Sequence, residues 1–422
     1  MREALAGLTV RGRAFLAAGV TAIVCAVILG QPALTRVGVL IAVLPLLTAL
    51  VIGRSRYRLA LVRTVTPQLV AAGQQARVSL TLTNEGRTPS GVLLLEDQVP
   101  YVLGTRPRFV LEGIGTGWRR HVTYPVRSDV RGRFEIGPMA VRVSDPFGLV
   151  ELGRTFRTTA SLTVTPRTVP LPAIPLGGAW TGSGDNRPRA FATGSAEDVT
   201  VRDYRRGDDL RRVHWRSSAR VGELMVRREE QPWQSRATLF LDNRLRSHRG
   251  QGLASSLEAA VSAAASIAVH LCHRGFTVRL VTAAGEDPAS AWHLRDSDLN
   301  TAPLLEALAV VTTVQQPRLA TGWLAEGAHG GLTVAVFGSI ESMDTALLRR
   351  MQHQAGSALA VALDVDAWVG KPGAGDGTAG LTQQGWRAVS LGPHDRLDAV
   401  WQELGRSSAR TGAVGEPPRV AR

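Results

Sequence analysis

The sequence contains little cysteine, almost no lysine and few aromatic residues. Only two of its 422 residues are cysteines, Cys25 and Cys272, which excludes a disulfide framework or a multi-cysteine zinc site and favours a reducing compartment. A hydrophobic fraction of 44% against 20% charged residues excludes disorder of the whole chain. Lys371 is the only lysine among 49 basic residues. The net charge of +14 therefore comes from arginines in nearly every segment, which favours anionic lipid but predicts no specific nucleic-acid surface.

Common catalytic signatures are also missing. The sequence has no Walker phosphate loop, no Gly-x-Ser-x-Gly nucleophile elbow and no His-Glu-x-x-His zinc motif. A hydrolase is one alternative, with His214 as general base acting with Asp208 and with Ser217 or Ser218. Such chemistry requires hydrogen-bond contact and an oxyanion hole, and proximity in sequence establishes neither. We therefore expect no enzyme activity and no cofactor.

Two uncharged apolar stretches near the start of the chain, residues 14–30 and 37–53, have 17 residues each. At about 1.5 Å per residue, this length is near the lower limit for crossing the hydrocarbon core. Several arginines flank the outer ends, whereas the loop between the stretches has only Arg36. The positive-inside rule then places both termini in the cytoplasm. We expect a membrane hairpin over residues 1–63 of a multi-pass protein, with a buried hairpin or a signal peptide as the alternatives.

Residues 64–166 predict an immunoglobulin-like β-sandwich. Polar and apolar residues alternate strictly over residues 77–83, and the turn signal Asn84-Glu85-Gly86 follows. Residues 144–149, Ser-Asp-Pro-Phe-Gly-Leu, predict a turn capped by Asp145, which we expect to be a structural corner and not a binding site. Residues 167–196 are rich in proline and glycine and predict a linker.

Residues 197–236 form an arginine-rich signature segment. Between Arg202 and Glu230 there are nine arginines and six acids, together with His214 and Trp215. Paired charges of this kind form either a recognition surface or a buried polar network, and the near balance of charge favours the network. A turn or helix start at residues 207–209 is expected to lead into a short helical or irregular piece that reaches Trp215, and a strand is expected from residue 223.

Residues 237–405 alternate between strand and helix patterns. The expected strands are 237–242, 276–282, 332–337, 359–365 and 386–391, and the expected helices are 253–274, 303–314, 342–354 and 395–404. This alternation predicts a mainly parallel sheet with helices on both faces. Asp242 would lie at the carboxyl end of a strand, where functional sites of such sheets are found. Residues 406–422 predict a disordered basic tail.

The Asp-Pro-Phe-Gly-Leu motif and the signature segment together resemble the domain of unknown function 58 family. The matching signature residues are Arg202, Tyr204, Gly207, Asp208, Arg211, His214, Trp215, Ser218, Arg220 and Glu229. The resemblance implies a bacterial membrane protein in which a β domain precedes an α/β region similar to a von Willebrand factor A domain. It also implies a MoxR-type AAA+ ATPase as partner, and often a transglutaminase-like membrane protein. It implies no reaction.

A von Willebrand A domain often binds Mg²⁺ through an Asp-x-Ser-x-Ser loop, because hard cations prefer oxygen ligands. The matching residues here are Asp242-Asn243-Arg244-Leu245-Arg246, with arginine at both serine positions. A guanidinium repels a cation, so we expect no metal and expect Asp242 to pair with Arg244 or with a signature arginine.

The function expected from these features is a membrane-anchored cytoplasmic scaffold or adaptor. It would contact the lipid bilayer and work with a MoxR-type AAA+ ATPase in the assembly or maturation of membrane-associated complexes. The alternatives are the hydrolase that uses His214, and a basic protein that binds nucleic acid or lipid.

Overall fold

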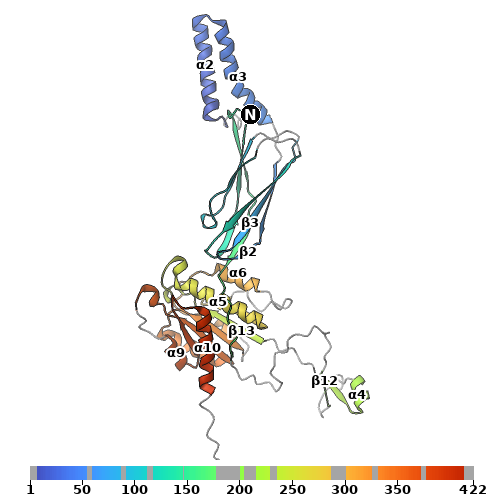
Figure 1. The fold of residues 1–422 in the computed structure, drawn as a ribbon, viewed down its shortest axis with the longest axis vertical. Coiled ribbons are helices and arrows are strands. Elements are labelled where there is room, and N and C mark those ends of the chain that lie inside the picture. The colour runs from blue at the N-terminus through green and yellow to red at the C-terminus, as the bar shows by residue number, and fades with distance from the viewer. Residues whose placement is uncertain are drawn as a thin grey trace, which may run out of the picture. The chain divides into compact units, whose positions relative to one another are not determined.

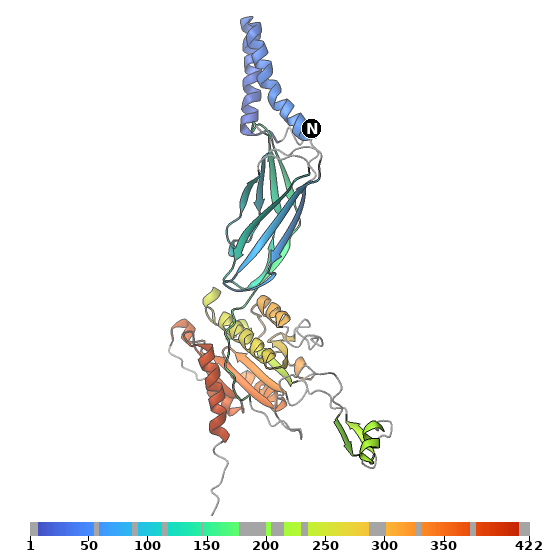
Figure 2. The same ribbon diagram turned by 45° about the vertical axis from the view of Figure 1, so that its right-hand side comes forward.

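The computed structural model divides the chain into two compact units. One unit comprises residues 1–169, 250–266 and 302–313, and the other comprises residues 170–249, 267–301 and 314–422. Their helices and strands can be followed in two ribbon views (Figure 1, Figure 2). The residues that the structure describes are 7–54, 59–86, 92–111, 117–145, 147–176, 200–203, 215–228, 235–286, 301–325, 331–371 and 377–412.

The first unit begins with a helical hairpin, α2 (Val10–Leu29) and α3 (Pro32–Arg54). Thr9 caps α2 by accepting a hydrogen bond from the backbone N–H of Gly12 at 3.1 Å. The helices pack closely, since a Cβ atom on Gly19 would overlap the backbone of Ala42. Both helices are long and apolar enough to cross a membrane. They are longer than the predicted stretches because flanking polar residues, including Arg11 and Arg36, continue the helices beyond the apolar runs.

The β-rich part of the first unit starts at Leu59, five residues before its predicted boundary at residue 64. Its described residues form three sheets with the strand orders β1-β3-β6, β2-β10-β7 and β5-β4-β8-β9, in which only the pair β2 and β10 is parallel. The ten strands are β1 (Leu59–Thr66), β2 (Leu69–Ala71), β3 (Gln75–Asn84), β4 (Val92–Asp97), β5 (Arg108–Leu111), β6 (Arg119–Arg127), β7 (Gly132–Ile136), β8 (Met139–Ser144), β9 (Glu151–Phe156) and β10 (Ala160–Thr165).

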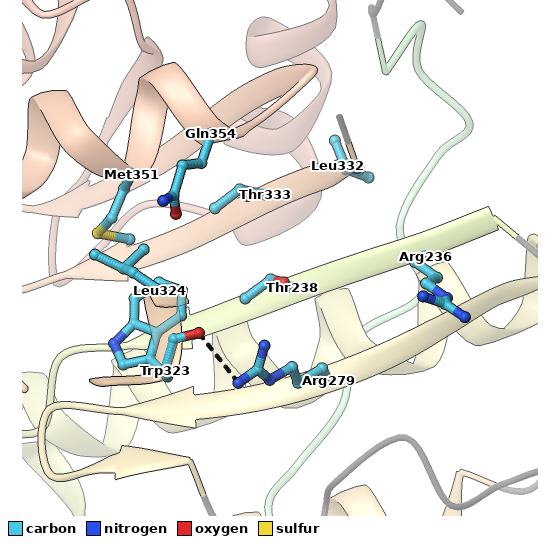
Figure 3. Close-up of a pocket in the computed structure, with 10 residues that line it drawn as sticks. Arg236, Thr238, Arg279, Trp323, Leu324, Leu332, Thr333, Met351 and Gln354 are labelled. Carbon is cyan, nitrogen blue, oxygen red and sulfur yellow. Dashed lines mark hydrogen bonds between the residues drawn. The ribbon is translucent and has the colours of Figure 1, made fainter. Parts of the chain in front are cut away.

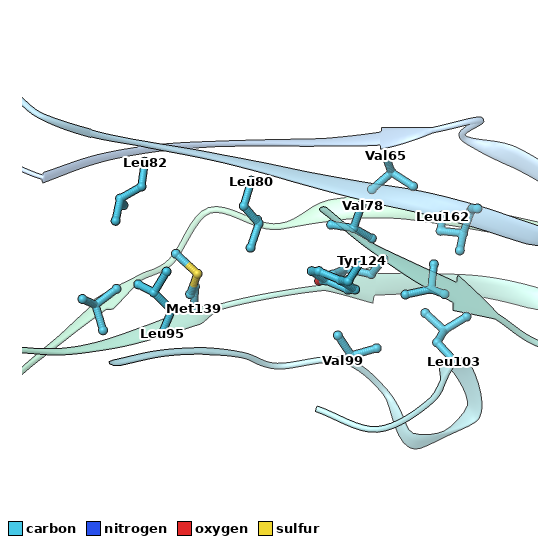
Figure 4. Packing of buried hydrophobic residues seen from close by; sticks show 14 of the residues in the cluster. Val65, Val78, Leu80, Leu82, Leu95, Val99, Leu103, Tyr124, Met139 and Leu162 are labelled. Carbon is cyan, nitrogen blue, oxygen red and sulfur yellow. The ribbon is translucent and has the colours of Figure 1, made fainter. Parts of the chain in front are cut away.

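One hydrophobic core joins these strands (Figure 4). The alternation predicted over residues 77–83 is confirmed, because Val78, Leu80 and Leu82 of β3 all point into this core. Alternating burial recurs in β4 and β8, which pair antiparallel. The β-rich region is thus built as predicted from half-buried strands.

A buried ion pair lies within this β-rich region. Asp97 accepts hydrogen bonds from Arg63 Nη2 and from the Tyr124 hydroxyl, each at 2.5 Å. The side chains of Arg63 and Asp97 are almost completely buried. Burial, reinforced by the hydrogen bond to the Asp97 carboxylate, raises the pKa of Tyr124 far above its usual range. Tyr124 therefore stays a hydrogen-bond donor, and Asp97 receives two donors in an otherwise apolar surrounding.

The second unit is built around one sheet with the strand order β15-β14-β13-β16-β17-β18. Five of these strands are parallel, and only the short edge strand β15 is antiparallel. The chain leaves β13 toward β14 and later returns to the other side of β13 as β16, so the strand order reverses between β13 and β16. The strands are β13 (Ser235–Leu241), β14 (Phe276–Thr282), β15 (Gly285–Glu286), β16 (Leu332–Phe337), β17 (Ser357–Leu363) and β18 (Arg387–Leu391).

Both faces of this sheet are covered, since every residue of β16 is buried. On one face, Phe240 and Phe337 pack with Leu348, Met351 and Leu381 from two helices. The helices that follow β13 in the chain are α5 (Ser256–His273), α6 (Ala302–Val310), α7 (Gly322–Ala325), α8 (Thr345–Gln354), α9 (Gly377–Gln383) and α10 (Leu397–Gly412). The mainly parallel sheet predicted from the strand and helix alternation is confirmed.

Two predicted boundaries are corrected. The helix expected over residues 303–314 ends at Val310, because Val314 instead donates its backbone N–H to the carbonyl of Asn243 at 3.0 Å. Helix α10 continues to Gly412 and so takes in the first residues of the segment expected to be a disordered tail. The buried side chains of Trp401 and Leu404 anchor this helix, and its last turns extend from that anchored part. Residues 413–422 lie outside the described residues.

Candidate functional site

A buried arginine occupies the carboxyl edge of the sheet where the strand order reverses. Asp242 directly follows β13, and Arg244 comes two residues later. The Arg244 guanidinium places Nη2 2.8 Å from Asp242 Oδ2 and Nη1 2.8 Å from Asp344 Oδ1. It also donates from Nε to Asp242 Oδ1 at 2.9 Å and from Nη2 to Asp344 Oδ2 at 3.0 Å. One guanidinium thus lies between two carboxylates, and all three side chains are almost completely buried.

The position of Asp344 depends on the turn that leaves β16. Asp344 ends the 3-10 helix η6 (Ser342–Asp344), where its Oδ2 also accepts the backbone N–H of Glu341 at 3.2 Å. The exit from β16 passes very close to the turn after Arg244: Ser339 donates its backbone N–H to the carbonyl of Ser247 at 2.8 Å. A Cβ atom on Gly338 would overlap that carbonyl, so glycine is required for the two loops to meet.

The charge of Arg244 is held in place by its partners. Burial alone would lower the pKa of Arg244, but the hydrogen bonds that Arg244 donates to Asp242 and Asp344 outweigh this effect and raise the pKa above its ordinary value. The guanidinium therefore takes the position at which a cation would neutralise the two acids. Among the described residues, no group of three or more His, Cys, Asp or Glu side chains is placed to hold a metal ion. The predicted pairing of Asp242 with Arg244 is confirmed.

A second titratable side chain, His248, packs against the same turn. Its Nε2 lies 2.6 Å from the backbone oxygen of Asp242, and because a carbonyl only accepts, Nε2 carries the proton. Burial lowers the pKa of His248, and the charges of Arg244 and Arg249 act in the same direction against the opposing effect of Asp242. Neither His248 nor Asp344 was predicted as part of the site. Asp242 could be predicted because it is an acid directly after a strand pattern. No comparable sequence pattern marks His248 or Asp344.

We expect the β13 region to open more readily as the pH falls. His248 has a pKa below its unfolded value of about 6.5, so the unfolded state binds more protons and stability is lost as the pH drops through that value. Hydrogen–deuterium exchange of β13 in the full chain, corrected for intrinsic rates, measures this between about pH 7.5 and about pH 5. His248→Asn should weaken the dependence, whereas His353→Asn, at an exposed position of α8, should not. An unchanged pH profile in His248→Asn would contradict the assignment.

Exposed and partly exposed side chains form a patch beside the buried ion pair, since Arg246 Nη2 lies 3.7 Å from Asp344 Oδ1. We define the edge patch as Leu245, Arg246, Glu341 and Met343. Leu245 and Met343 are both more than half exposed. Arg246 joins the two loops, since its Nη1 lies 3.1 Å from Glu341 Oε2 and its Nη2 lies 3.2 Å from Met343 Sδ. The edge therefore presents two apolar side chains with a charged pair beside them.

The signature segment is described only in part. Strands β11 (Thr200–Asp203) and β12 (Met225–Arg228) pair antiparallel, with the short helix α4 (Trp215–Val221) between them. The helix α4 begins at Trp215, and the helical or irregular piece predicted for residues 207–214 lies outside the described residues. The strand expected from residue 223 begins at Met225. Arg202 lies in β11. The predicted site residues outside the described residues are Tyr204, Gly207, Asp208, Arg211, His214 and Glu229.

The remaining predicted residues of the signature segment differ in exposure. Trp215 is 69% exposed, and Arg220 is also exposed, so α4 and its two strands bury neither side chain themselves. Ser218 is buried, and its hydroxyl accepts the backbone N–H of Met225 at 2.8 Å, which ties α4 to β12. Ser218 therefore has a structural role in this segment, while Trp215 and Arg220 are available for contact.

A small cavity lies toward the amino ends of β13 and β16 (Figure 3). Arg236, Thr238 and Arg279 line it from the strands, and Arg279 donates to the carbonyl of Trp323 at 3.3 Å. Its volume of about 30 Å³ is of the order of one or two water molecules. The cavity is therefore too small for an organic substrate.

Residues 200–312 match the family model described as "Protein of unknown function DUF58". This match confirms the family predicted from the signature residues and adds no activity. No curated protein matches the chain.

Solved structures resemble only parts of the chain. The CARDB domain of the PF1109 protein from Pyrococcus furiosus is 15% identical over 26% of this chain and 93% of that chain, with a TM-score of 0.20. The putative ApaA protein from Bordetella pertussis is 16% identical over 27% of this chain and 98% of that chain, with a TM-score of 0.20. The alkylpurine DNA glycosylase AlkC from Pseudomonas fluorescens is 18% identical over 32% of this chain and 40% of that chain, with a TM-score of 0.18. These similarities carry no information on activity.

Proposed function

We propose that this chain, which belongs to the DUF58 protein family, is a membrane-anchored cytoplasmic scaffold or adaptor. In this proposal α2 and α3 hold the protein in the bacterial cell membrane, and the arginines outside the apolar stretches keep both termini on the cytoplasmic side. The β-rich region, as an immunoglobulin-like sandwich, connects the hairpin to an α/β region of the von Willebrand A type. The α/β region binds the partner.

The observation that supports this function best is the Arg244 guanidinium between Asp242 and Asp344. In place of an exchangeable cation, a side chain of the protein itself supplies a positive charge between the two acids at the carboxyl edge. The loops on either side are therefore fixed without any ligand, and the edge patch that they carry is already formed before a partner arrives. Such an edge suits constitutive protein binding and requires no metal or nucleotide.

The composition of the edge patch suits a protein partner. Leu245 and Met343 supply exposed apolar groups, and methionine adapts its shape readily to an opposing surface. Arg246 and Glu341 supply a polar rim of the kind that surrounds apolar contacts in interfaces. We propose a MoxR-type AAA+ ATPase as the partner that binds here, in the assembly or maturation of membrane-associated complexes. A transglutaminase-like membrane protein would be a further member of such a complex.

We expect an acidic substitution in the edge patch to weaken partner binding. Leu245→Asp and Met343→Asp would each place a charge at the centre of the contact and reduce recovery of the ATPase by about tenfold or more, equivalent to about 1.4 kcal/mol. The measurement is affinity purification of the full chain from detergent-solubilised membranes after cross-linking, with quantitative mass spectrometry of the retained proteins.

His353→Asp provides the matched control, because it introduces the same charge at an exposed position near the other end of α8. It should leave recovery unchanged. Equal membrane abundance and unchanged hydrogen exchange in β13 would show that all variants fold. Retention of the ATPase by both patch variants would contradict the placement of the interface, and a wild-type chain that retains no AAA+ ATPase would contradict the proposed partner.

A further inference from the structure

The turn at residues 145–149 is attached directly to the start of the first membrane helix. Thr9 donates its hydroxyl to the carbonyl of Gly148 at 2.7 Å and its backbone N–H to the carbonyl of Leu149 at 2.9 Å. Leu8 and Val150 form an antiparallel bridge. A Cβ atom on Gly12 would overlap the carbonyl of Leu149, so α2 runs against the turn as closely as a helix backbone permits.

Apolar contacts tie the same turn to the second helix. Leu149 and Val150 are buried in one cluster with Ala49 of α3, and Leu8 and Leu44 pack against it. The predicted structural corner is therefore present, and it also holds the β-rich part of the first unit against both helices of the hairpin.

The turn is stiffened from within by Asp145. Its Oδ1 accepts the backbone N–H of Val150 at 2.7 Å, and its Oδ2 accepts the backbone N–H of Phe147 at 3.0 Å. The Asp145 side chain is buried, and its bond to Val150 is shielded from water. These two bonds fix the backbone at Phe147 and Val150.

Among the described residues of this turn, Phe147 is the one large apolar side chain that is exposed to solvent, with 61% of its surface accessible. Leu149 and Val150, which follow it, are both buried. Arg11 lies next to the turn, because a Cβ atom on Gly148 would be 3.8 Å from its Nη1. An aromatic ring and a guanidinium thus occur together beside the first turn of α2.

The position of Phe147 and Arg11 along α2 indicates the depth at which both side chains would lie in a bilayer. Thr9 and Arg11 precede the apolar run, which starts at residue 14, by about 5 to 8 Å at about 1.5 Å per residue. That distance corresponds to the boundary between headgroups and acyl chains, where aromatic rings are favoured. Arginine at the same depth attracts anionic lipid phosphates.

We propose that the turn at residues 145–149 is a second membrane contact, in which Phe147 inserts into the boundary between headgroups and acyl chains. Arg11 binds lipid phosphate beside it. This contact rests on the proposed membrane hairpin. It fixes the orientation of the β-rich region at the bilayer, because the loop that touches the lipid is the loop bonded to α2.

Site-directed spin labelling of the full chain tests this contact. A nitroxide is placed at Phe147→Cys in a chain that carries Cys25→Ser and Cys272→Ala, reconstituted into vesicles of phosphatidylcholine and phosphatidylglycerol. Power saturation then compares accessibility to oxygen, which concentrates in lipid, with accessibility to a water-soluble nickel chelate. We expect an oxygen-to-nickel ratio severalfold higher at position 147 than at a water-exposed site.

Two further labelled sites separate the possible outcomes. Tyr101→Cys is the aqueous reference, because Tyr101 is 92% exposed and follows the end of β4 that is opposite to the end paired with Ser144. Val24→Cys, exposed in the middle of α2, is the lipid reference. If position 24 reports lipid and position 147 matches position 101, the turn is only a structural corner and the contact is refuted, while the hairpin stands. If position 24 also reports water, the membrane hairpin itself is refuted, and the contact with it.

Discussion

Replacing Arg244 with serine is expected to destabilise the sheet of the second unit by about 3 to 5 kcal/mol, the cost of removing one partner from a buried ion pair. The change removes the guanidinium that donates four side-chain hydrogen bonds to Asp242 and Asp344. Both carboxylates are buried, so water cannot replace those donors without opening the edge. Hydrogen exchange of β13 and β16 in the full chain measures the loss as faster exchange.

A divalent cation should recover much of this loss in the variant. Serine at position 244 would leave a hydroxyl beside two carboxylates, a set of oxygen donors suited to Mg²⁺. Binding at a hundredfold excess over the dissociation constant stabilises a fold by about 2.7 kcal/mol. Added MgCl₂ should therefore slow exchange of β13 in Arg244→Ser and have little effect on the wild-type chain, in which the guanidinium already fills the position.

Arg396→Ser is the matched control for this experiment. Arg396 also makes a bidentate pair, in which its Nε and Nη2 donate to the Asp398 carboxylate at 3.2 and 2.7 Å. The Arg396 side chain is exposed. Exposed pairs contribute little to stability, so exchange should not change. An effect of Arg244→Ser no larger than that of Arg396→Ser would show that the buried guanidinium does not hold the edge together. Equal stabilisation of the wild-type chain by MgCl₂ would show that the cation binds elsewhere.

The sequence was sufficient to predict the strands of the second unit because their signal is local. Buried parallel strands are continuous apolar runs, and the predicted ranges 276–282 and 332–337 coincide with β14 and β16. Asp242 was placed correctly for the same reason, as the first acid after such a run. Asp344 was missed because its role depends on β16 lying beside β13. Strand order is a property of the whole sheet, and no pattern within β16 or η6 reports it.

The turn at residues 145–149 shows the same limit in the first unit. Its chemistry was predictable, since an aspartate before a glycine-containing turn caps backbone N–H groups, as Asp145 does. Its attachment to Thr9 was not, because more than a hundred residues separate the two partners. The functional interpretation of Phe147 comes only from that attachment. An exposed phenylalanine on a turn has no special meaning until the turn is placed at the start of a helix that is long and apolar enough to cross a membrane.

Removing the Asp97 carboxylate is expected to have an effect of similar size in the β-rich region. Asp97→Ala would leave Arg63 buried without its counter-ion and the Tyr124 hydroxyl without its acceptor, at a cost of about 3 to 5 kcal/mol. Faster hydrogen exchange in β3, with unchanged exchange in β13, would place the loss in this region. Glu96→Ala is the control, because the neighbouring carboxylate pairs with an exposed arginine, Arg108, at 3.3 Å.

A double substitution tests whether the Arg63–Asp97 ion pair adds net stability or only offsets the cost of burying its two charges. Burying two charges costs so much desolvation that replacing both by apolar residues of similar size is often neutral. Arg63→Met combined with Asp97→Leu should therefore recover much of the stability that Asp97→Ala alone removes. The bond that Arg63 makes to the carbonyl of Thr158 stays lost, and the Tyr124 hydroxyl stays without its acceptor. If the double variant is as unstable as the single one, the pair contributes net stability through its hydrogen bonds. If Asp97→Ala itself matches Glu96→Ala, the buried pair is not needed, and the hydrophobic core around Val78 and Leu80 holds the region alone.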